Sequence, residues 1–301
     1  MDDKKHARDA VLSYARLPML AMSVLFYFLG ASLVRFLGEA VDVAPFFLGM
    51  GFILLVILFS GWIKGYYDTR EDMQNRLGLE SFSPQAFLLA RQLLWQGSLA
   101  SLVVAAVLAV FMGVQGLLNV PGSTLLLLVF GTSYIYSVPP LRLVYRGYGE
   151  LATAVLLANL TPALSFTLQT GELHRLVGMV TFPLTALLLA FQLARSLEPY
   201  ASDMKYKRKT MMVALGWQRG MTLHNILVLG AYVLLGAAAL FNLPWGITWP
   251  VLLTLPLALG LVWMMIRIAN GAKPAWKLLS FLSSSLLVLA TYLFTYSLWI
   301  G

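Results

Sequence analysis

The sequence has no cysteine, few histidines and few charged residues. The absence of cysteine excludes disulfides, thiolate nucleophiles and cysteine-based metal sites. The three histidines, at positions 6, 174 and 224, are scattered along the chain and form no cluster. Charged residues make up 11% of the chain, and we find no glycine-rich phosphate loop, no soluble domain and no low-complexity segment. We therefore expect the chemistry to lie in the two longest polar stretches, around 64–91 and 196–220.

Apolar residues dominate the composition of the chain. They make up 59% of the 301 residues, with a mean hydropathy of +0.79, which is more than a soluble domain can bury. Runs such as Leu125–Phe130 do not alternate between apolar and polar residues, as strands of a membrane barrel do. A helical span needs about 20 apolar residues, and nine stretches qualify: 18–38, 43–63, 92–114, 120–138, 150–170, 176–195, 222–242, 247–267 and 279–300.

These stretches predict an all-α, polytopic integral membrane protein with about nine transmembrane helices, forming a single domain over residues 1–301. The segment before the first span carries both signs of charge and is followed by no small-residue cleavage site, so we expect it to be retained.

Basic residues are distributed unevenly among the connections. With a cytoplasmic N-terminus, 19 of the 21 Lys and Arg fall on the inside, and only Arg35 and Arg175 lie outside. The positive-inside rule then places the N-terminus and the polar loops on the cytoplasmic side. We expect the membrane to be the inner membrane of a prokaryote. Topology accounts for the net charge of +8, and no nucleic-acid partner is expected because no basic groove with interleaved aromatic residues accompanies it.

The first polar stretch follows the second predicted span. Lys64, Asp68, Asp72 and Arg76 are spaced four apart, so on a continuous helix they form one stripe of two acids between two bases. Two carboxylates one turn apart can hold Mg²⁺ and leave coordination positions for phosphate oxygens. The alternative is a solvated helix end with ion pairs along one face.

The second polar stretch follows the sixth predicted span. Glu198 and Asp203 stand directly before a basic run that contains Lys205, Lys207 and Arg208. Acids that bind metal, next to bases, can neutralise a diphosphate leaving group. The alternative is a basic juxtamembrane loop attracted to anionic lipid.

A third segment runs from Tyr136 to Glu150, after the fourth predicted span. Pro139 and Pro140 end that span and direct a stiff loop with Arg142 and Arg146 along the membrane surface.

This third segment resembles the corresponding loop of the UbiA superfamily of intramembrane prenyltransferases, in the MenA-like branch that contains 1,4-dihydroxy-2-naphthoate polyprenyltransferases. The resemblance covers nearly the whole chain, in the expected order and spacing. The other segments that carry it are Arg16-Leu-Pro18, Tyr66-Tyr-Asp68 with Asp72, and Lys209-Thr-Met-Met-Val-Ala-Leu-Gly216.

The resemblance implies transfer of a polyprenyl group from a polyprenyl diphosphate to an aromatic or quinone-precursor acceptor in the lipid bilayer. It implies that two Mg²⁺ ions hold the diphosphate between two Asp-rich motifs, and that the polyprenyl tail lies in a tunnel open to lipid. Ionisation of the diphosphate would give an allylic cation, which the acceptor ring captures.

By the same resemblance, Asp68, Asp72 and Asp203 are expected metal ligands. Glu198 joins them only if Pro199 bends the helix. Two positions of the first family motif, Asn-Asp-x-x-Asp-x-x-x-Asp, are changed here to Lys64 and Gly65. Diphosphate contacts are expected from Lys64, Arg142, Lys205, Lys207 and Arg208, with Tyr136, Arg146 and Glu150 in the loop that closes over the site.

Several alternatives stay open. Glu150 is expected either to accept a proton from the acceptor or to form an ion pair with Arg146. Prenyl transfer to a polar-lipid acceptor, or cyclisation of an isoprenoid diphosphate, is a second hypothesis for the function. A non-catalytic isoprenoid-binding or transport protein is a third.

Overall fold

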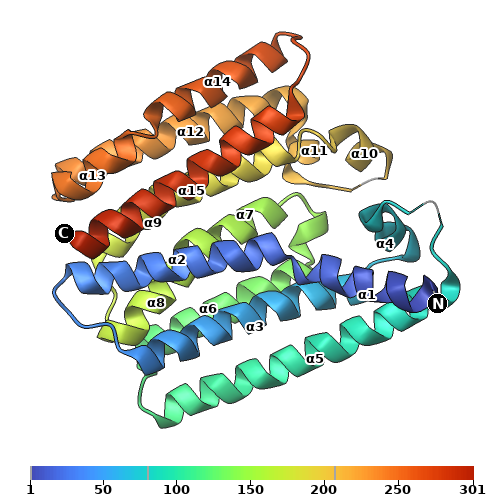
Figure 1. Cartoon of the computed structure of the whole chain (residues 1–301), viewed down its shortest axis with the longest axis horizontal. Helices are drawn as coiled ribbons and strands as arrows, with labels where there is room; N and C mark the ends of the chain where they lie inside the picture. The colour runs from blue at the N-terminus through green and yellow to red at the C-terminus, as the bar shows by residue number, and fades with distance from the viewer. Residues whose placement is uncertain (1, 80, 207) are drawn as a thin grey trace.

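The computed structural model describes residues 2–79, 81–206 and 208–301, and every regular element in these ranges is a helix. Figure 1 shows the long helices side by side along the long axis of the molecule. This arrangement confirms the predicted all-α class. That the chain forms a single domain stays a prediction.

The first half of the chain forms one group of packed helices. The N-terminal helix α1 (Asp2–Ala15) leads into α2 (Leu17–Phe36), and α3 (Val43–Tyr67) packs chiefly against α5 (Pro84–Val114). Caps fix the starts of the next two long helices. The Ser83 hydroxyl accepts the N–H of Ala86 at the start of α5, and the Asn119 side chain accepts the N–H of Gly122 at the start of α6 (Val120–Ser137).

The fifth span is one continuous helix with an irregular middle. It consists of α7 (Gly149–Val155), a wide π-helical turn η2 (Leu156–Leu160) and α8 (Thr161–Thr170). The irregular turn directly precedes Pro162, whose ring has no N–H and would clash with a carbonyl of a regular α-helix.

The second half of the chain completes the bundle. Helix α9 (Arg175–Arg195) packs along α12 (Trp217–Leu240), and α15 (Trp276–Ile300) packs against both α2 and α9. These contacts join the last helix of the chain to the first span.

The predicted number of spans holds with one qualification. Within the described residues, eight helices are long and apolar enough to cross a membrane. The ninth predicted span, 247–267, forms as two helices, α13 (Trp245–Leu252) and α14 (Leu255–Ala269), with a bend of 42° between them. Pro250 and Pro256 flank this bend, and each removes a backbone donor from the helical ladder.

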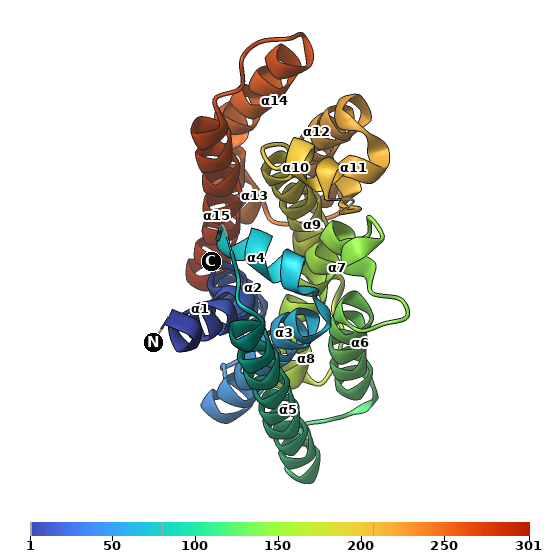
Figure 2. The same ribbon diagram turned by 90° about the vertical axis from the view of Figure 1, so that its right-hand side faces the viewer.

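The polar segments gather at one end of the bundle. They are the short helices α4 (Arg70–Leu77), η1 (Leu143–Tyr145), α10 (Tyr200–Lys205) and α11 (Met211–Leu215). In Figure 1, α4, α10 and α11 all lie at the right-hand end, where the N-terminus also lies. Figure 2 looks onto this polar end and shows α4 between the helices of the first half and α7, α10 and α11. The two polar stretches are therefore neighbours in space.

Candidate active site

The carboxylate of Asp68 lies at the end of α3 and is only 4% exposed. Its Oδ1 accepts hydrogen bonds from the Arg142 guanidinium and, at 2.7 Å, from the Tyr145 hydroxyl. Its Oδ2 accepts the Tyr14 hydroxyl at 2.6 Å and lies 3.6 Å from the Lys64 ammonium. A carboxylate has about four acceptor positions, so three hydrogen bonds fill most of them and the Lys64 ammonium adds an ion pair at Oδ2.

Lys64 sits one helical turn before Asp68 and is nearly buried, with 9% exposure. Its ammonium lies 5.5 Å from the ring centre of Tyr14 and 5.3 Å from that of Tyr145. Aromatic faces attract cations and replace part of the hydration that burial removes. Tyr14 and Tyr145 therefore stabilise both members of the pair. Their hydroxyls donate hydrogen bonds to Asp68, and their rings lie next to the Lys64 ammonium.

Asp72 belongs to a different helix from Asp68. Helix α3 ends at Tyr67, and Thr69 caps a new helix, α4, in a reciprocal capping box with Asp72. Oδ2 of Asp72 accepts the Thr69 N–H and hydroxyl at 3.2 and 2.7 Å, while its Oδ1 lies 3.7 Å from the Arg208 guanidinium. The prediction of a stripe along one continuous helix is wrong, because the Thr69 cap breaks the helix between the two acids.

Asp203 on α10 is a buried acid without a counter-charge in direct contact. Within residues 2–79, 81–206 and 208–301, its carboxylate makes no hydrogen bond and no ion pair. Burial raises the pKa of this carboxyl, and the charge of Arg208 opposes that rise. A second cation near Asp203 would stabilise its ionised form.

These acids border a polar cavity of about 160 Å³ at the polar end of the bundle. The polar cavity is lined by Tyr14, Lys64, Asp68, Asp72, Arg76, Val144, Tyr145, Asp203, Arg208 and Thr210. It joins the two polar stretches, whose lining residues Arg76 and Asp203 are more than 120 residues apart in the sequence. Arg142 stands behind Asp68 and is absent from this lining, so it acts on the cavity through Asp68.

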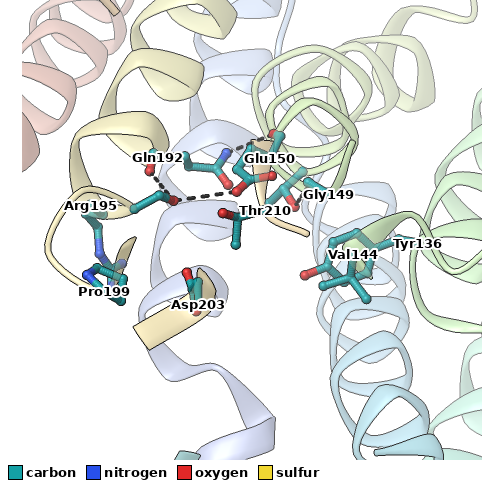
Figure 3. Close-up of a pocket in the computed structure, with 11 residues that line it drawn as sticks. Tyr136, Val144, Gly149, Glu150, Gln192, Arg195, Pro199, Asp203 and Thr210 are labelled. Carbon is teal, nitrogen blue, oxygen red and sulfur yellow. Dashed lines mark hydrogen bonds between the residues drawn. The ribbon is translucent and has the colours of Figure 1, made fainter. Parts of the chain in front are cut away.

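A middle cavity of about 310 Å³ adjoins the polar cavity and shares Val144, Asp203 and Thr210 with it. Figure 3 shows its lining, in which Tyr136 and Asp203 face Glu150 and Gln192 across the space.

Glu150 anchors the loop that borders the middle cavity. Its carboxylate accepts the N–H of Met211 at 3.1 to 3.2 Å and the Ser196 hydroxyl at 3.5 Å, while its backbone carbonyl accepts the side chain of Gln192 (Figure 3). The expected pairing with Arg146 is wrong, because the Arg146 guanidinium instead donates to the carbonyl of Pro140 at 2.7 Å. Glu150 thereby fixes the start of α11.

An apolar cavity of about 460 Å³ continues from the middle cavity, and the two share Thr153, Gln192 and Arg195. It lies among α2, η2, α9 and α15. Its other lining residues are Arg16, Pro18, Met19, Ala21, Met22, Leu157, Leu188, Phe191, Ser280, Ser284 and Val288. The three cavities therefore form a series that runs from charged to apolar.

Arg16 and Arg195 stand where the apolar cavity meets the middle one, and neither was among the diphosphate contacts expected from the sequence. The Arg16 guanidinium lies 5.1 Å from the ring centre of Tyr136, and its Nη1 is buried without a hydrogen-bond partner among the described residues. The sequence feature that could have indicated these two arginines is their position, because each stands at the polar end of a predicted span.

The structure leaves other expected residues outside the cavity series. Lys205 is exposed and lies 5.6 Å from the ring of Tyr206. Glu198 lines none of these three cavities and instead borders a further space of about 350 Å³, which shares Arg195 with both the middle and the apolar cavity. Lys207 lies outside the described residues.

The acids fit one Mg²⁺ but not the pair that the resemblance implies. Among the described residues there is no group of three or more His, Asp or Glu side chains arranged to hold a metal. Asp72 and Asp203 line the polar cavity, and among the described residues neither Oδ1 of Asp72 nor the Asp203 carboxylate accepts a hydrogen bond. Mg²⁺ is commonly bound by one or two carboxylates together with substrate phosphates. Asp68 is less suited to a metal, because its carboxylate already accepts three hydrogen bonds and lies between the two cations of Lys64 and Arg142.

Comparisons with known proteins agree on one family. The sequence profile of the UbiA prenyltransferase family matches residues 22–286. A 1,4-dihydroxy-2-naphthoate octaprenyltransferase of Bacillus subtilis (strain 168) is 23% identical over 150 residues, which are 50% of this chain and 39% of that protein. The match thus spans well under two thirds of that relative's length.

Two solved structures share the fold. A digeranylgeranylglyceryl phosphate synthase superposes with a TM-score of 0.67 at 12% identity, covering 99% of both chains. A UbiA homolog from Archaeoglobus fulgidus bound to GPP and Mg²⁺ superposes with a TM-score of 0.59 at 17% identity, covering 94% of this chain and 99% of that one.

The two arginines of the loop after α6 provide a test of this geometry. Replacing Arg142 with Ala removes one partner of the buried Asp68. Such losses typically cost about 3–5 kcal/mol, and we expect about 2–3 kcal/mol here because Lys64 remains. Arg146→Ala should change stability by less than about 0.5 kcal/mol. Thermal unfolding of both variants in the same detergent would measure this difference, and equal losses would contradict the Asp68 network.

Proposed function

Because this chain belongs to the UbiA prenyltransferase family, we propose that it transfers a polyprenyl group from a polyprenyl diphosphate to an aromatic, quinone-precursor acceptor of the 1,4-dihydroxy-2-naphthoate type. The family match confirms the resemblance found in the loop from Tyr136 to Glu150. The observation that carries the proposal is the series of three adjoining cavities, which share lining residues and change from charged to apolar along the bundle.

The polar cavity suits the diphosphate. Lys64, Arg76 and Arg208 line it and present positive charge to the anion. When the carbon–oxygen bond of the substrate breaks, its electron pair leaves with the diphosphate, so these bases stabilise the transition state more than the bound substrate. A Mg²⁺ held by Asp72 and Asp203 would neutralise further charge on the departing group.

The apolar cavity suits the polyprenyl chain. Met19, Met22, Leu157, Leu188 and Phe191 supply apolar surface along it. Burying a hydrocarbon chain there gains roughly 25 cal/mol per Å². Arg16 and Arg195 mark the point where this lining becomes polar, and we assign them contacts to the diphosphate end of the chain.

The middle cavity suits the reacting carbon and the acceptor. The allylic cation forms there between the polar and apolar cavities, shielded from bulk water, and the electron-rich ring of the acceptor forms the new carbon–carbon bond. The ring of Tyr136 is held in place beneath Arg16. We propose that the Glu150 carboxylate takes the hydroxyl proton of the acceptor as the ring attacks, which raises the electron density of the ring. The proton on the attacked ring carbon then moves to the deprotonated oxygen, which restores the aromatic hydroxyl.

Charge distribution supports the proposed orientation. The polar end carries α1, α4, η1, α10 and α11 with most of the basic residues, while Arg35 and Arg175 belong to the opposite connections. We propose that the polar end faces the cytoplasm from the inner membrane of a prokaryote.

The reaction itself can be assayed directly. Purified protein with geranylgeranyl diphosphate, Mg²⁺ and 1,4-dihydroxy-2-naphthoate should release diphosphate and yield a prenylated naphthoate, detected by mass spectrometry. Asp72→Ala should lower turnover by about 100-fold or more, as expected when a transition-state contact is lost. Glu71→Ala is the matched control, because this neighbouring acid on α4 is exposed and lines none of the three cavities.

Other outcomes of this assay identify the alternatives. Diphosphate release with only a polar lipid, or with no acceptor, would replace the aromatic acceptor by lipid prenylation or by cyclisation. Binding of the diphosphate without turnover under any of these conditions would favour an isoprenoid carrier and refute the proposed reaction.

Glu150→Gln separates the proton-accepting role from the structural one. The amide oxygen of glutamine can still accept the Met211 N–H, so we expect near-native thermal stability and near-native affinity for the prenyl diphosphate. Turnover should fall by about 100-fold or more because an amide accepts no proton. A native rate in Glu150→Gln, with loss of stability in Glu150→Ala, would leave Glu150 with the positioning role alone.

A further inference from the structure

At Asp68, an expected metal ligand, the positive charge is supplied by protein side chains. Lys64 and Arg142 both contact this carboxylate directly, and the side chain of Asp68 is nearly inaccessible to solvent. Two positive charges and one negative charge leave the cluster with a net charge of one positive unit. A divalent ion at Asp68 would have to displace a hydrogen-bond donor from its Oδ1, or approach its Oδ2 against the charge of the Lys64 ammonium 3.6 Å away.

The packing of α1 also leaves no room for a side chain at Gly65, the residue next to Lys64. A Cβ atom added at Gly65 would lie 2.8 and 2.9 Å from two ring carbons of Tyr14 and 3.0 Å from a methyl group of Leu94. The ring of Tyr14 is buried and is held in place by the hydrogen bond from its hydroxyl to Asp68. The ring of Tyr14 thus occupies the space that an acidic side chain at position 65 would need.

The ammonium of Lys64 remains available to a ligand. Lys64 lines the polar cavity together with Arg76 and Arg208. The acids Asp72 and Asp203 border the same space. A lysine ammonium is a compact point charge that binds phosphate oxygens well. The lining of the polar cavity therefore combines fixed protein cations with carboxylates suited to a metal.

We propose that Lys64, supported by Arg142 through Asp68, takes the place of one of the two divalent ions. This inference rests on the prenyl diphosphate site proposed above. The protein then binds its substrate with a single Mg²⁺ on Asp72 and Asp203, and it keeps affinity for the diphosphate when no metal is present.

Metal counting provides the first test. The purified protein is saturated with the thiolodiphosphate analogue of geranylgeranyl diphosphate, which resists ionisation, and titrated with Mn²⁺ while electron paramagnetic resonance follows the free ion. We expect one tightly bound Mn²⁺ per protein. Two tightly bound ions would overturn the inference and leave the proposed function standing.

Binding without metal provides the second test. In EDTA, the analogue should still bind, with affinity reduced by no more than about 100-fold from that in Mg²⁺. Lys64→Met should weaken metal-free binding by a further 10-fold or more, because the ammonium that contacts the diphosphate is gone. Lys277→Met is the control: this exposed lysine at the start of α15 lines none of the cavities, and its replacement should leave both affinities unchanged.

The remaining outcomes are distinguishable. Binding in Mg²⁺ but none in EDTA, or unchanged metal-free binding in Lys64→Met, would overturn the role of Lys64 while the proposed function stands. No binding of the analogue in either condition would contradict the proposed function and the inference with it. If Lys64→Met does not fold, the Mn²⁺ count and the EDTA measurement on the native protein decide the inference by themselves.

Discussion

The buried carboxylate of Asp68 is the interaction on which the polar end of this protein depends. An uncompensated carboxylate in such a place would cost several kcal/mol, and the chain compensates it with partners from its own helix and from two distant segments. Tyr14 comes from α1, Lys64 from α3, and Arg142 and Tyr145 from the loop after α6. One acid thus holds the N-terminal helix, the second span and the proline-rich loop in a fixed relation.

The cavity series depends on that relation. With the loop after α6 fixed, Val144 and Tyr145 form one wall of the polar cavity, and the chain continues into α7, where Glu150 holds the start of α11. The α11 segment in turn brings Thr210 into both the polar and the middle cavity. The charged end of the site is therefore built by ion pairs and caps, whereas its apolar end is formed by packed spans of the bundle.

Hydropathy predicted most of the fold, because apolar runs of sufficient length admit few other structures in lipid. The break between Asp68 and Asp72 was missed, although Thr69 and Asp72 have the spacing of a capping box that marks a helix start. The contributions of Tyr14, Arg16 and Tyr145 could not be predicted from periodicity, because their partners lie 54 to 120 residues away. Sequence patterns indicated which polar segments matter, and the tertiary contacts determine which side chains meet.

The most direct test of this account is an experimental structure with the thiolodiphosphate analogue of geranylgeranyl diphosphate and Mg²⁺ bound. The account predicts the diphosphate in the polar cavity in contact with Lys64 and Arg208, the isoprenoid chain in the apolar cavity between α2, α9 and α15, and Asp68 still paired with Arg142. A diphosphate bound elsewhere, or Asp68 released from its partners to ligate a metal, would contradict it.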